Sequence, residues 1–174
     1  KEELNRTDSE VLTFYRYTKQ DNWNAVDPEI KTESERCLSF KDLNESIFNE
    51  TLTLLDENLL KKIIICCVPS HKEDNKKHCM YRLTQELSLR DRIDGSDCLQ
   101  RTKSIQKLTT AGSDRSVEVH YRSIDVFNKA LFTNKSVLLL DDVKTSGNSL
   151  KACQNLLKNN GAKNVFMLAI WKTV

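Results

Sequence analysis

Two adjacent acids, Asp141 and Asp142, directly follow the apolar run of residues 137–140. If that run is a buried strand, both carboxyl groups stand at its carboxyl end, where they repel each other and are poorly solvated. This cost is explained if the two acids hydrogen-bond the hydroxyl groups of a ligand. A diol is the natural partner for such a pair.

The polar turn after the acids carries groups that bind phosphate. It consists of Lys144, Thr145, Ser146, Gly147, Asn148 and Ser149. A helical pattern of apolar residues follows at 149–158, so small hydroxyls, free backbone N–H groups and the positive end of a helix dipole converge on one point. The acids and the turn are spaced like the hydroxyls and the 5-phosphate of one ribose phosphate. The alternative, a capped helix after a buried strand, leaves both acids unexplained.

The elements that position these residues follow from the apolar pattern. Residues 63–68 form a continuously apolar, β-branched run, which predicts a strand buried on both faces. Residues 137–140 and 165–170 predict two more strands, and residues 43–60 have the spacing of an amphipathic helix. A strand, helix and strand in this order make a right-handed crossover. We therefore expect an α/β fold with a Rossmann-like, mostly parallel sheet and helices on both faces.

The remaining segments have weaker patterns. Residues 94–122 are basic and show little periodicity, so we interpret them as a mobile basic loop region, and residues 124–132 as its helix-like continuation. The polar, mixed residues 1–42 predict an N-terminal extension that packs on the core. Residues 43–174 then form the main domain.

The composition excludes several classes of protein. A chain of 174 residues is long enough for one domain with a sizeable core. Its net charge of +2 gives no reason to expect a nucleic-acid partner. No apolar run approaches the roughly 20 residues that a membrane helix needs, so no membrane partner is expected.

The six cysteines contain no C-x-x-C pair and no regular spacing. This argues against a disulfide framework and a zinc ribbon, and it favours a reducing, cytoplasmic compartment. Cys66 and Cys67 lie within an apolar run and are predicted to be small buried hydrophobes. His78 and Cys79 have no third ligand at a suitable spacing, so no metal site is predicted there.

The sequence VLLLDDVKTSGNSL, residues 137–150, resembles the 5-phosphoribosyl 1-pyrophosphate (PRPP) motif of the type I phosphoribosyltransferase family. Two further stretches resemble the ComF-like, amidophosphoribosyltransferase-related branch of that family. The first is similar to its V-P-x-H-basic segment at Val68, Pro69, His71 and Lys72. The second is similar at Leu99, Arg101, Thr102, Gln106, Leu108 and Arg115. Together the matches span residues 63–170.

The chain departs from the pattern of this branch in three places. Lys144 stands where the family usually has an aliphatic residue. Residues 78–82, HCMYR, replace the usual R-G-F-N-Q helix start. The zinc-binding cysteine cluster that often precedes the domain is absent from the sequence.

The resemblance implies a type I phosphoribosyltransferase fold with a flexible hood loop, and it implies PRPP as the ligand. Asp141 and Asp142 would hold the ribose hydroxyls, and residues 144–149 would bind the 5-phosphate. Mg²⁺ is implied as the cofactor, held through PRPP and not directly by the protein. Ligands of such sheets bind beyond the carboxyl ends of the strands. The residues after Val68 and the residues after position 140 are both expected there.

The loop after Val68 is expected to bind the pyrophosphate. Backbone N–H groups of Ser70, His71 and Lys72 would surround it, with His71 and Lys72 adding positive charge. The basic residues Lys76, Lys77 and His78 either extend this patch or form an ordinary solvated helix face.

Arg101 and Arg115 lie in the segment that, in this family, folds over the substrate. There they would stabilise the departing pyrophosphate, and the alternative is a surface loop with incidental arginines. With the two acids they are the predicted catalytic residues of a transferase. Thr145 stands where 6-oxopurine enzymes carry an aspartate, which disfavours those bases as acceptors and leaves uracil, orotate, amines and others.

A second hypothesis is a module that senses PRPP or a nucleotide without base transfer, with a toxin or defence effector as a variant. A purely structural domain is the least favoured because the acids and the phosphate turn are intact. A homodimer or a larger complex is compatible with each hypothesis.

Overall fold

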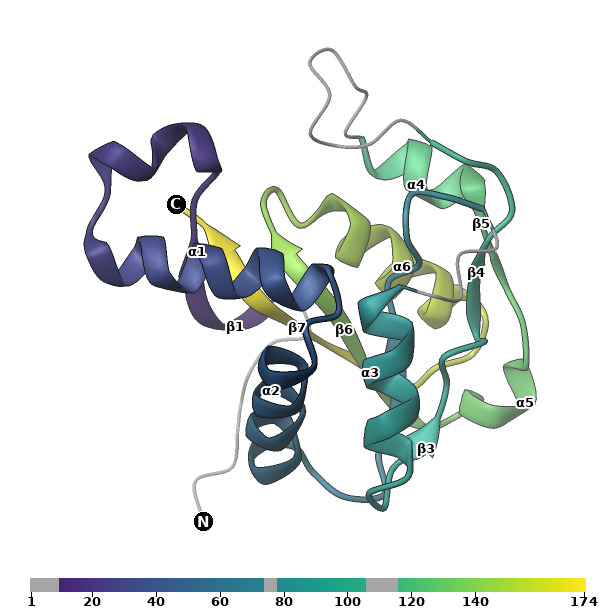
Figure 1. The fold of residues 1–174 in the computed structure, drawn as a ribbon. Helices are drawn as coiled ribbons and strands as arrows, with labels where there is room; N and C mark the ends of the chain where they lie inside the picture. Colours follow the sequence, from purple (N-terminus) through teal and green to yellow (C-terminus); the bar gives the residue numbers. More distant parts are fainter. Residues whose placement is uncertain (1–9, 74–77, 106–115) are drawn as a thin grey trace.

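The computed structural model of the chain describes residues 10–73, 78–105 and 116–174. Five strands form one sheet in the order β1-β7-β6-β2-β3 (Figure 1). Their bounds are β1 Val11–Tyr17, β2 Ile64–Cys67, β3 Ile93–Asp94, β6 Ser136–Lys144 and β7 Asn164–Thr173. Each neighbouring pair in this sheet is parallel. The predicted Rossmann-like, mostly parallel sheet is confirmed.

Helices cover both faces of the sheet (Figure 1). One face carries α1 Pro28–Lys41, α2 Glu45–Asn58 and α3 Cys79–Ser88, with the short η1 Gln20–Ala25 before them. The other carries α4 Val117–Ser123, α5 Lys129–Phe132 and α6 Asn148–Asn159, together with an antiparallel pair of strands, β4 Leu99–Arg101 and β5 Ile124–Val126. Among the described residues, none of the helices has both the length and the hydrophobicity that crossing a membrane requires.

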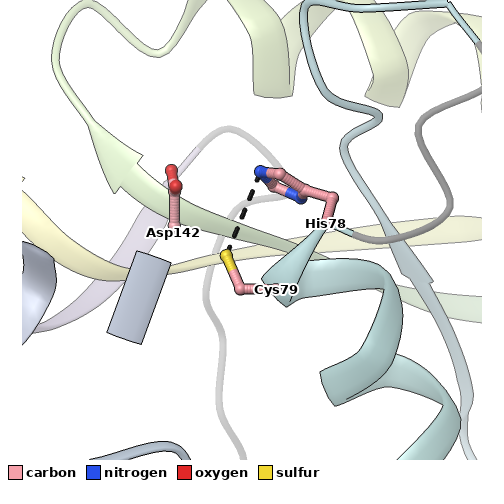
Figure 2. Close-up of side chains that lie close together, drawn as sticks. All are labelled: His78, Cys79 and Asp142. Atoms are coloured by element: carbon pink, nitrogen blue, oxygen red, sulfur yellow. Dashed lines mark hydrogen bonds between the residues drawn. The ribbon is translucent and has the colours of Figure 1, made fainter. Parts of the chain in front are cut away.

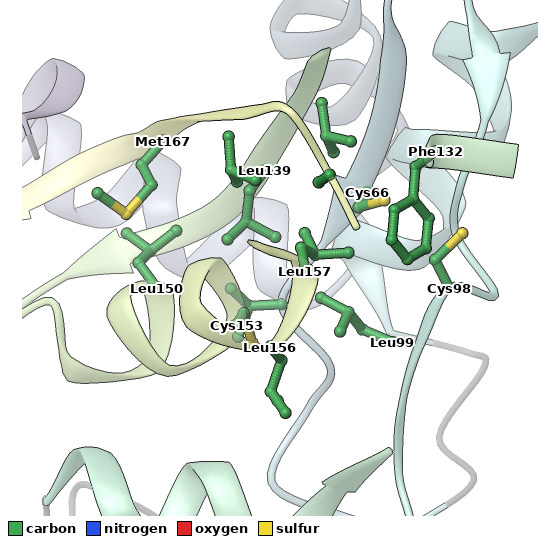
Figure 3. Packing of buried hydrophobic residues seen from close by; sticks show 14 of the residues in the cluster. Cys66, Cys98, Leu99, Phe132, Leu139, Leu150, Cys153, Leu156, Leu157 and Met167 are labelled. Carbon is green, nitrogen blue, oxygen red and sulfur yellow. The ribbon is translucent and has the colours of Figure 1, made fainter. Parts of the chain in front are cut away.

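A hydrophobic core lies on each face because the buried strands are apolar on both sides. Ile65 and Cys67 of β2 belong to the core beneath α1, α2 and α3. Ile64 and Cys66 belong to the core beneath α6, where Leu157 packs (Figure 3). Both cysteines are buried free thiols, as the sequence predicts.

Local signals in the sequence account for where the helices begin and end. The Asp27 carboxylate accepts a hydrogen bond from the Glu29 N–H at 2.8 Å and starts α1, and Pro28 occupies its first position. The Asn44 side chain caps α2 in the same way. Gly161, with φ of +106°, follows the end of α6 in a left-handed conformation that favours glycine.

The strand predicted at residues 137–140 is longer than the sequence indicates. β6 continues to Lys144, so Asp141 and Asp142 lie within the strand and not after it. The reason is the pairing partner: β7 is also long, and it pairs with β6 at Asp141↔Ala169 and Val143↔Trp171. The backbone of both acids is therefore held by the sheet.

The N-terminal residues contribute directly to the sheet. β1 pairs with β7 in register Val11↔Met167, and α1 then packs on the sheet through Cys37 and Phe40. β1 is an edge strand whose side chains are half-buried or exposed, so it lacks the apolar run of a buried strand. The domain boundary at residue 43 stays a prediction.

The expectation of a loop region at residues 94–122 is wrong for its described parts, which contain β4 and α4. The expectation of a helix from residue 124 is also wrong, because residues 124–126 form β5 and only the short α5 follows. β4 and β5 have three residues each and pair with each other. Strands this short carry too little periodicity to be recognised in a sequence.

Gly95 allows the end of β3 to approach β2 closely. Its N–H donates to the Ile65 carbonyl at 2.8 Å, and a Cβ at this position would lie 2.7 Å from that oxygen and from Cys66 Sγ. We expect Gly95→Ala to lower the free energy of unfolding by about 1 to 3 kcal/mol, because the backbone or the thiol must shift. Equilibrium unfolding in urea measures the loss.

Ser96→Ala is the matched control for this substitution. The buried Ser96 Oγ has no hydrogen-bond partner within the described ranges, so removing it should leave the free energy of unfolding unchanged or raise it. Equal losses for Gly95→Ala and Ser96→Ala would contradict the close approach of the two strands.

Candidate ligand-binding site

The carboxyl end of β2 lies beside Leu140 of β6, directly before the two acids. The two strands are parallel neighbours, and the Val68 N–H extends their pairing by donating to the Leu140 carbonyl at 2.9 Å. A pocket opens where the strands end. It is lined by Lys41, Val68, Pro69, Ser70, His71, His78, Arg101, Ile105, His120, Asp141, Asp142, Val143 and Ser149.

Asp141 is buried and hydrogen-bonded on both carboxyl oxygens. Its Oδ1 accepts from the Asp142 N–H at 2.9 Å, and its Oδ2 lies 3.1 Å from the Ser149 hydroxyl at the start of α6. Burial, reinforced by the charge of Asp142, raises the pKa of Asp141 well above its usual range. Asp141 therefore favours the protonated, neutral form.

Asp142 is in the opposite state because a lysine lies beside it. Lys41 Nζ, from the last residue of α1, lies 3.4 Å from Asp142 Oδ2. Burial acts to raise the pKa of Asp142, but Lys41, His78 and the Val143 N–H outweigh it and hold that pKa below its usual range. Burial likewise acts to lower the pKa of Lys41, and Asp142 more than reverses this. The two pKa shifts have opposite directions and thus favour one neutral and one charged acid, which lessens the repulsion expected between them.

The turn predicted to bind phosphate lies beside the acids. Gly147, with φ of +80°, precedes α6 and has no side chain to cap that helix. Thr145 and Ser146 are exposed, and Thr145 Oγ1 lies 2.9 Å from Thr173 Oγ1. The Ser146 hydroxyl accepts a long, 3.4 Å hydrogen bond from the Asn148 N–H. Of residues 144–149, only Ser149 lines the pocket of the acids.

The loop after β2 is folded on itself and tied to the segment after β4. Ser70 Oγ accepts from the Lys72 N–H and donates to the Lys72 carbonyl, both at 3.2 Å. The His71 carbonyl accepts from the Ile105 N–H at 3.0 Å. Ser70 and His71 line the pocket of the acids, whereas the exposed Lys72 lines an adjoining pocket with Asp97 and Gln100. The sequence therefore identifies two of these three residues as neighbours of the acids.

Arg101 is placed differently from the expectation of a lid residue. It is 3% exposed, and its guanidinium donates to the Ser70 carbonyl at 2.5 Å and to Ser123 Oγ at 2.5 Å. It also contacts the Pro69 carbonyl and His120 Nδ1. Burial lowers the pKa of Arg101. Arg101 thus holds the loop after β2 from β4, while Arg115 and Gln106 lie outside the described residues.

Three basic residues of the pocket, Lys41, His78 and His120, were not predicted from the sequence as site residues. Lys41 and His120 come from helices that sequence analysis did not connect with the acids. His78 is half-buried and caps α3 by accepting from the Met80 N–H at 3.4 Å, so it does not belong to a solvated helix face. Burial is the main cause that lowers the pKa of His78, which favours the neutral imidazole. Lys76 and Lys77 lie outside the described residues.

No protein-family model and no curated protein sequence matches this chain.

Isosteric substitutions of the two acids should change stability in opposite directions. At pH 7, Asp141→Asn should raise the free energy of unfolding and Asp142→Asn should lower it by about 1 to 3 kcal/mol, because Lys41 then loses its partner. The raised pKa of Asp141 means that the unfolded chain loses this proton first, so its contribution to stability falls as the pH rises above about 4. The lowered pKa of Asp142 gives a contribution that is present above about pH 4 and is lost as the pH falls through the folded value.

Urea unfolding from about pH 2 to pH 8 measures both differences and includes the range below pH 4 in which the Asp142 contribution is lost. Asp125→Asn, on the exposed side of β5, is the control and should change little. Effects of the same sign at Asp141 and Asp142 would contradict the assignment of one neutral and one charged acid.

Removal of Arg101 should destabilise the loop after β2. Arg101→Ala leaves the Pro69 and Ser70 carbonyls without this donor, so we expect the free energy of unfolding to fall by about 2 to 3 kcal/mol. The exposed Lys103→Ala is the control and should stay within roughly 0.5 kcal/mol of the parent. A similarly small change for Arg101→Ala, measured by urea unfolding, would mean that the loop does not depend on this contact.

Proposed function

We propose that this chain binds PRPP together with Mg²⁺ and releases its pyrophosphate, by transferring the ribose 5-phosphate to an acceptor. The observation that carries the proposal is a convergence at the sheet edge. Asp141 and Asp142 of β6, the start of α6 and the loop after β2 lie around one pocket. A small phosphorylated sugar is the proposed partner, and a cytoplasmic location is part of the proposal.

The charge states of the acids suit a sugar diol. The ionised Asp142 carboxylate accepts hydrogen bonds from ribose hydroxyls, and a protonated Asp141 both donates and accepts. Since Asp141 is already bonded to Ser149, the hydroxyls would meet Asp142 first. Negative charge on Asp142 also stabilises the positive charge that develops on the ribose ring as pyrophosphate leaves.

The phosphate groups have two sites beside these acids. The turn before α6 offers backbone N–H groups at a helix of 12 residues, with no side chain on Gly147 to occupy them. The loop after β2 brings Ser70 and His71 to the pocket and is the proposed second phosphate site, although its Lys72 N–H already donates to Ser70 Oγ. Arg101 supports this second site by fixing the loop, a positioning role that replaces the expected closing motion.

The residues present fit a magnesium ion carried in with the ligand. Mg²⁺ prefers oxygen donors and is commonly held by one or two carboxylates together with substrate phosphates. Asp142 supplies an ionised carboxylate that is partly exposed to the pocket. When bound, the ion neutralises charge on the pyrophosphate.

Sensing of the same ligand without turnover is a second candidate function. The specific observation that favours it is the Lys41–Asp142 ion pair, which connects α1 to the site. A ligand that hydrogen-bonds Asp142 competes with Lys41, so binding would be transmitted to α1. The two functions differ in whether pyrophosphate is released.

Calorimetric titration with PRPP and Mg²⁺ tests the shared part of both functions. We expect binding, and a rise in melting temperature that corresponds to about 2.7 kcal/mol when the ligand is at 100 times its Kd. Asp142→Asn should raise Kd by about tenfold or more, since a hydrogen bond to a charged group contributes roughly 1.5 kcal/mol or more. The exposed Asp125→Asn is the control and should bind like the parent.

Pyrophosphate release, measured with and without candidate bases or amines, then separates the functions. Release that requires an acceptor indicates a transferase, release without one indicates hydrolysis, and binding without release indicates a sensor. No binding of PRPP at millimolar concentration would reject all of them.

A further inference from the structure

Three side chains of different chemistry converge between β6 and the start of α3. His78, Cys79 and Asp142 each offer one ligand atom, and these atoms lie within 4.8 Å of one another. Figure 2 shows the imidazole of His78 and the thiol of Cys79 next to the carboxylate of Asp142. The dashed contact joins His78 Nε2 to Cys79 Sγ at 4.0 Å.

We propose that His78, Cys79 and Asp142 form a binding site for Zn²⁺. Nitrogen, sulfur and carboxylate oxygen are the three donor types that zinc accepts in proteins, and three protein ligands leave a fourth position open. A thiolate disfavours Mg²⁺ and Ca²⁺, which take oxygen donors. The site therefore differs in chemistry from the magnesium proposed to enter with PRPP, and it does not rest on that function.

The distance between Cys79 Sγ and His78 Nε2 requires only a small adjustment. In a tetrahedral zinc site, a sulfur and a nitrogen ligand are separated by about 3.5 Å, as follows from bond lengths near 2.3 and 2.0 Å. Rotation of the His78 ring can shorten the 4.0 Å contact to this value. The Cys79 backbone is held in α3 and the Asp142 backbone in β6. These two ligands therefore belong to regular secondary structure elements.

The open coordination position would face the pocket. His78 and Asp142 both line the pocket at the sheet edge, whereas Cys79 is 1% exposed and lies behind them. An ion would thus reach the ligands from the pocket. On binding, a Zn–S bond replaces the S–H bond of Cys79 and one proton passes to solvent.

Two contacts must give way when an ion binds. His78 Nδ1 accepts from the Met80 N–H at a long 3.4 Å, so Nε2 is free to bind an ion only when the ring proton moves to Nδ1. Lys41 Nζ, 3.4 Å from Asp142 Oδ2, is repelled by an incoming dication. Lys41 is therefore an internal competitor of the metal, and this gives the proposal a test that a merely structural cluster would fail.

Cobalt is a suitable probe because Co²⁺ takes zinc sites and a thiolate ligand adds a charge-transfer absorption in the near ultraviolet. We expect this absorption when Co²⁺ alone is added to the reduced full chain, and we expect Zn²⁺ to abolish it. Cys79→Ala should lose the absorption, whereas Cys153→Ala, a buried cysteine in the opposite core, should retain it. His78→Gln should weaken Co²⁺ binding by more than roughly 10- to 100-fold. That range is the cost of losing a residue that only hydrogen-bonds a metal ligand.

Lys41→Met keeps the result decisive even if a ligand variant does not fold. Removing the competing ammonium should tighten Co²⁺ binding by about tenfold, by analogy with the contribution of one charge-assisted contact. Absence of a thiolate absorption in the parent, its persistence in Cys79→Ala, or unchanged or weaker binding in Lys41→Met would each overturn the proposal. Since no PRPP is added, these outcomes are independent of the titration with that ligand.

Discussion

The parallel pairing of β2 with β6 is the constraint on which the candidate site depends. Four residue pairs, from Ile64↔Val137 to Cys67↔Leu140, set the register, and the Val68 N–H adds one more contact. Because the strands are parallel and β2 ends opposite Leu140, the loop after β2 lies beside the next two residues of β6, Asp141 and Asp142. The same strands are apolar on both faces, so the pairing that builds the two cores also brings the polar groups together.

The two acids show how burial and one nearby cation can separate adjacent identical groups. The Asp141 carboxyl is hydrogen-bonded to the Ser149 hydroxyl and to the Asp142 N–H, and its burial favours the neutral form. The Asp142 carboxylate is paired with the Lys41 ammonium, which favours its ionised form. Two adjacent acids within one strand therefore present a carboxyl that favours the donor-capable form beside one that favours the charged form. This pair is better suited to a diol than two charged groups, which would repel each other.

Elements with a local, periodic signal are predicted correctly from the sequence. The apolar run of β2 and the helical pattern of α6 each follow from spacing within their own segment. Elements that depend on long-range contacts are not. β1 is a half-exposed edge strand with no strong pattern, and the burial of Arg101 depends on Ser123, which is 22 residues away. Lys41 and His78 reach Asp142 from different helices, and no local spacing encodes that meeting.

Asp142 is the point at which the possible states of the site exclude one another. Within the described ranges its carboxylate has one ammonium partner, Lys41, and the ligand atoms of His78 and Cys79 also lie close to it. A sugar hydroxyl, a dication and Lys41 would all bind the Asp142 carboxylate. The binding free energy of each would be smaller when another already occupies that carboxylate. Binding of a sugar or a dication would therefore be coupled to the position of α1, because Lys41 belongs to that helix. The N-terminal third lies outside the segments that resemble the phosphoribosyltransferase family. It nevertheless supplies Lys41, the residue that favours the charged form of Asp142.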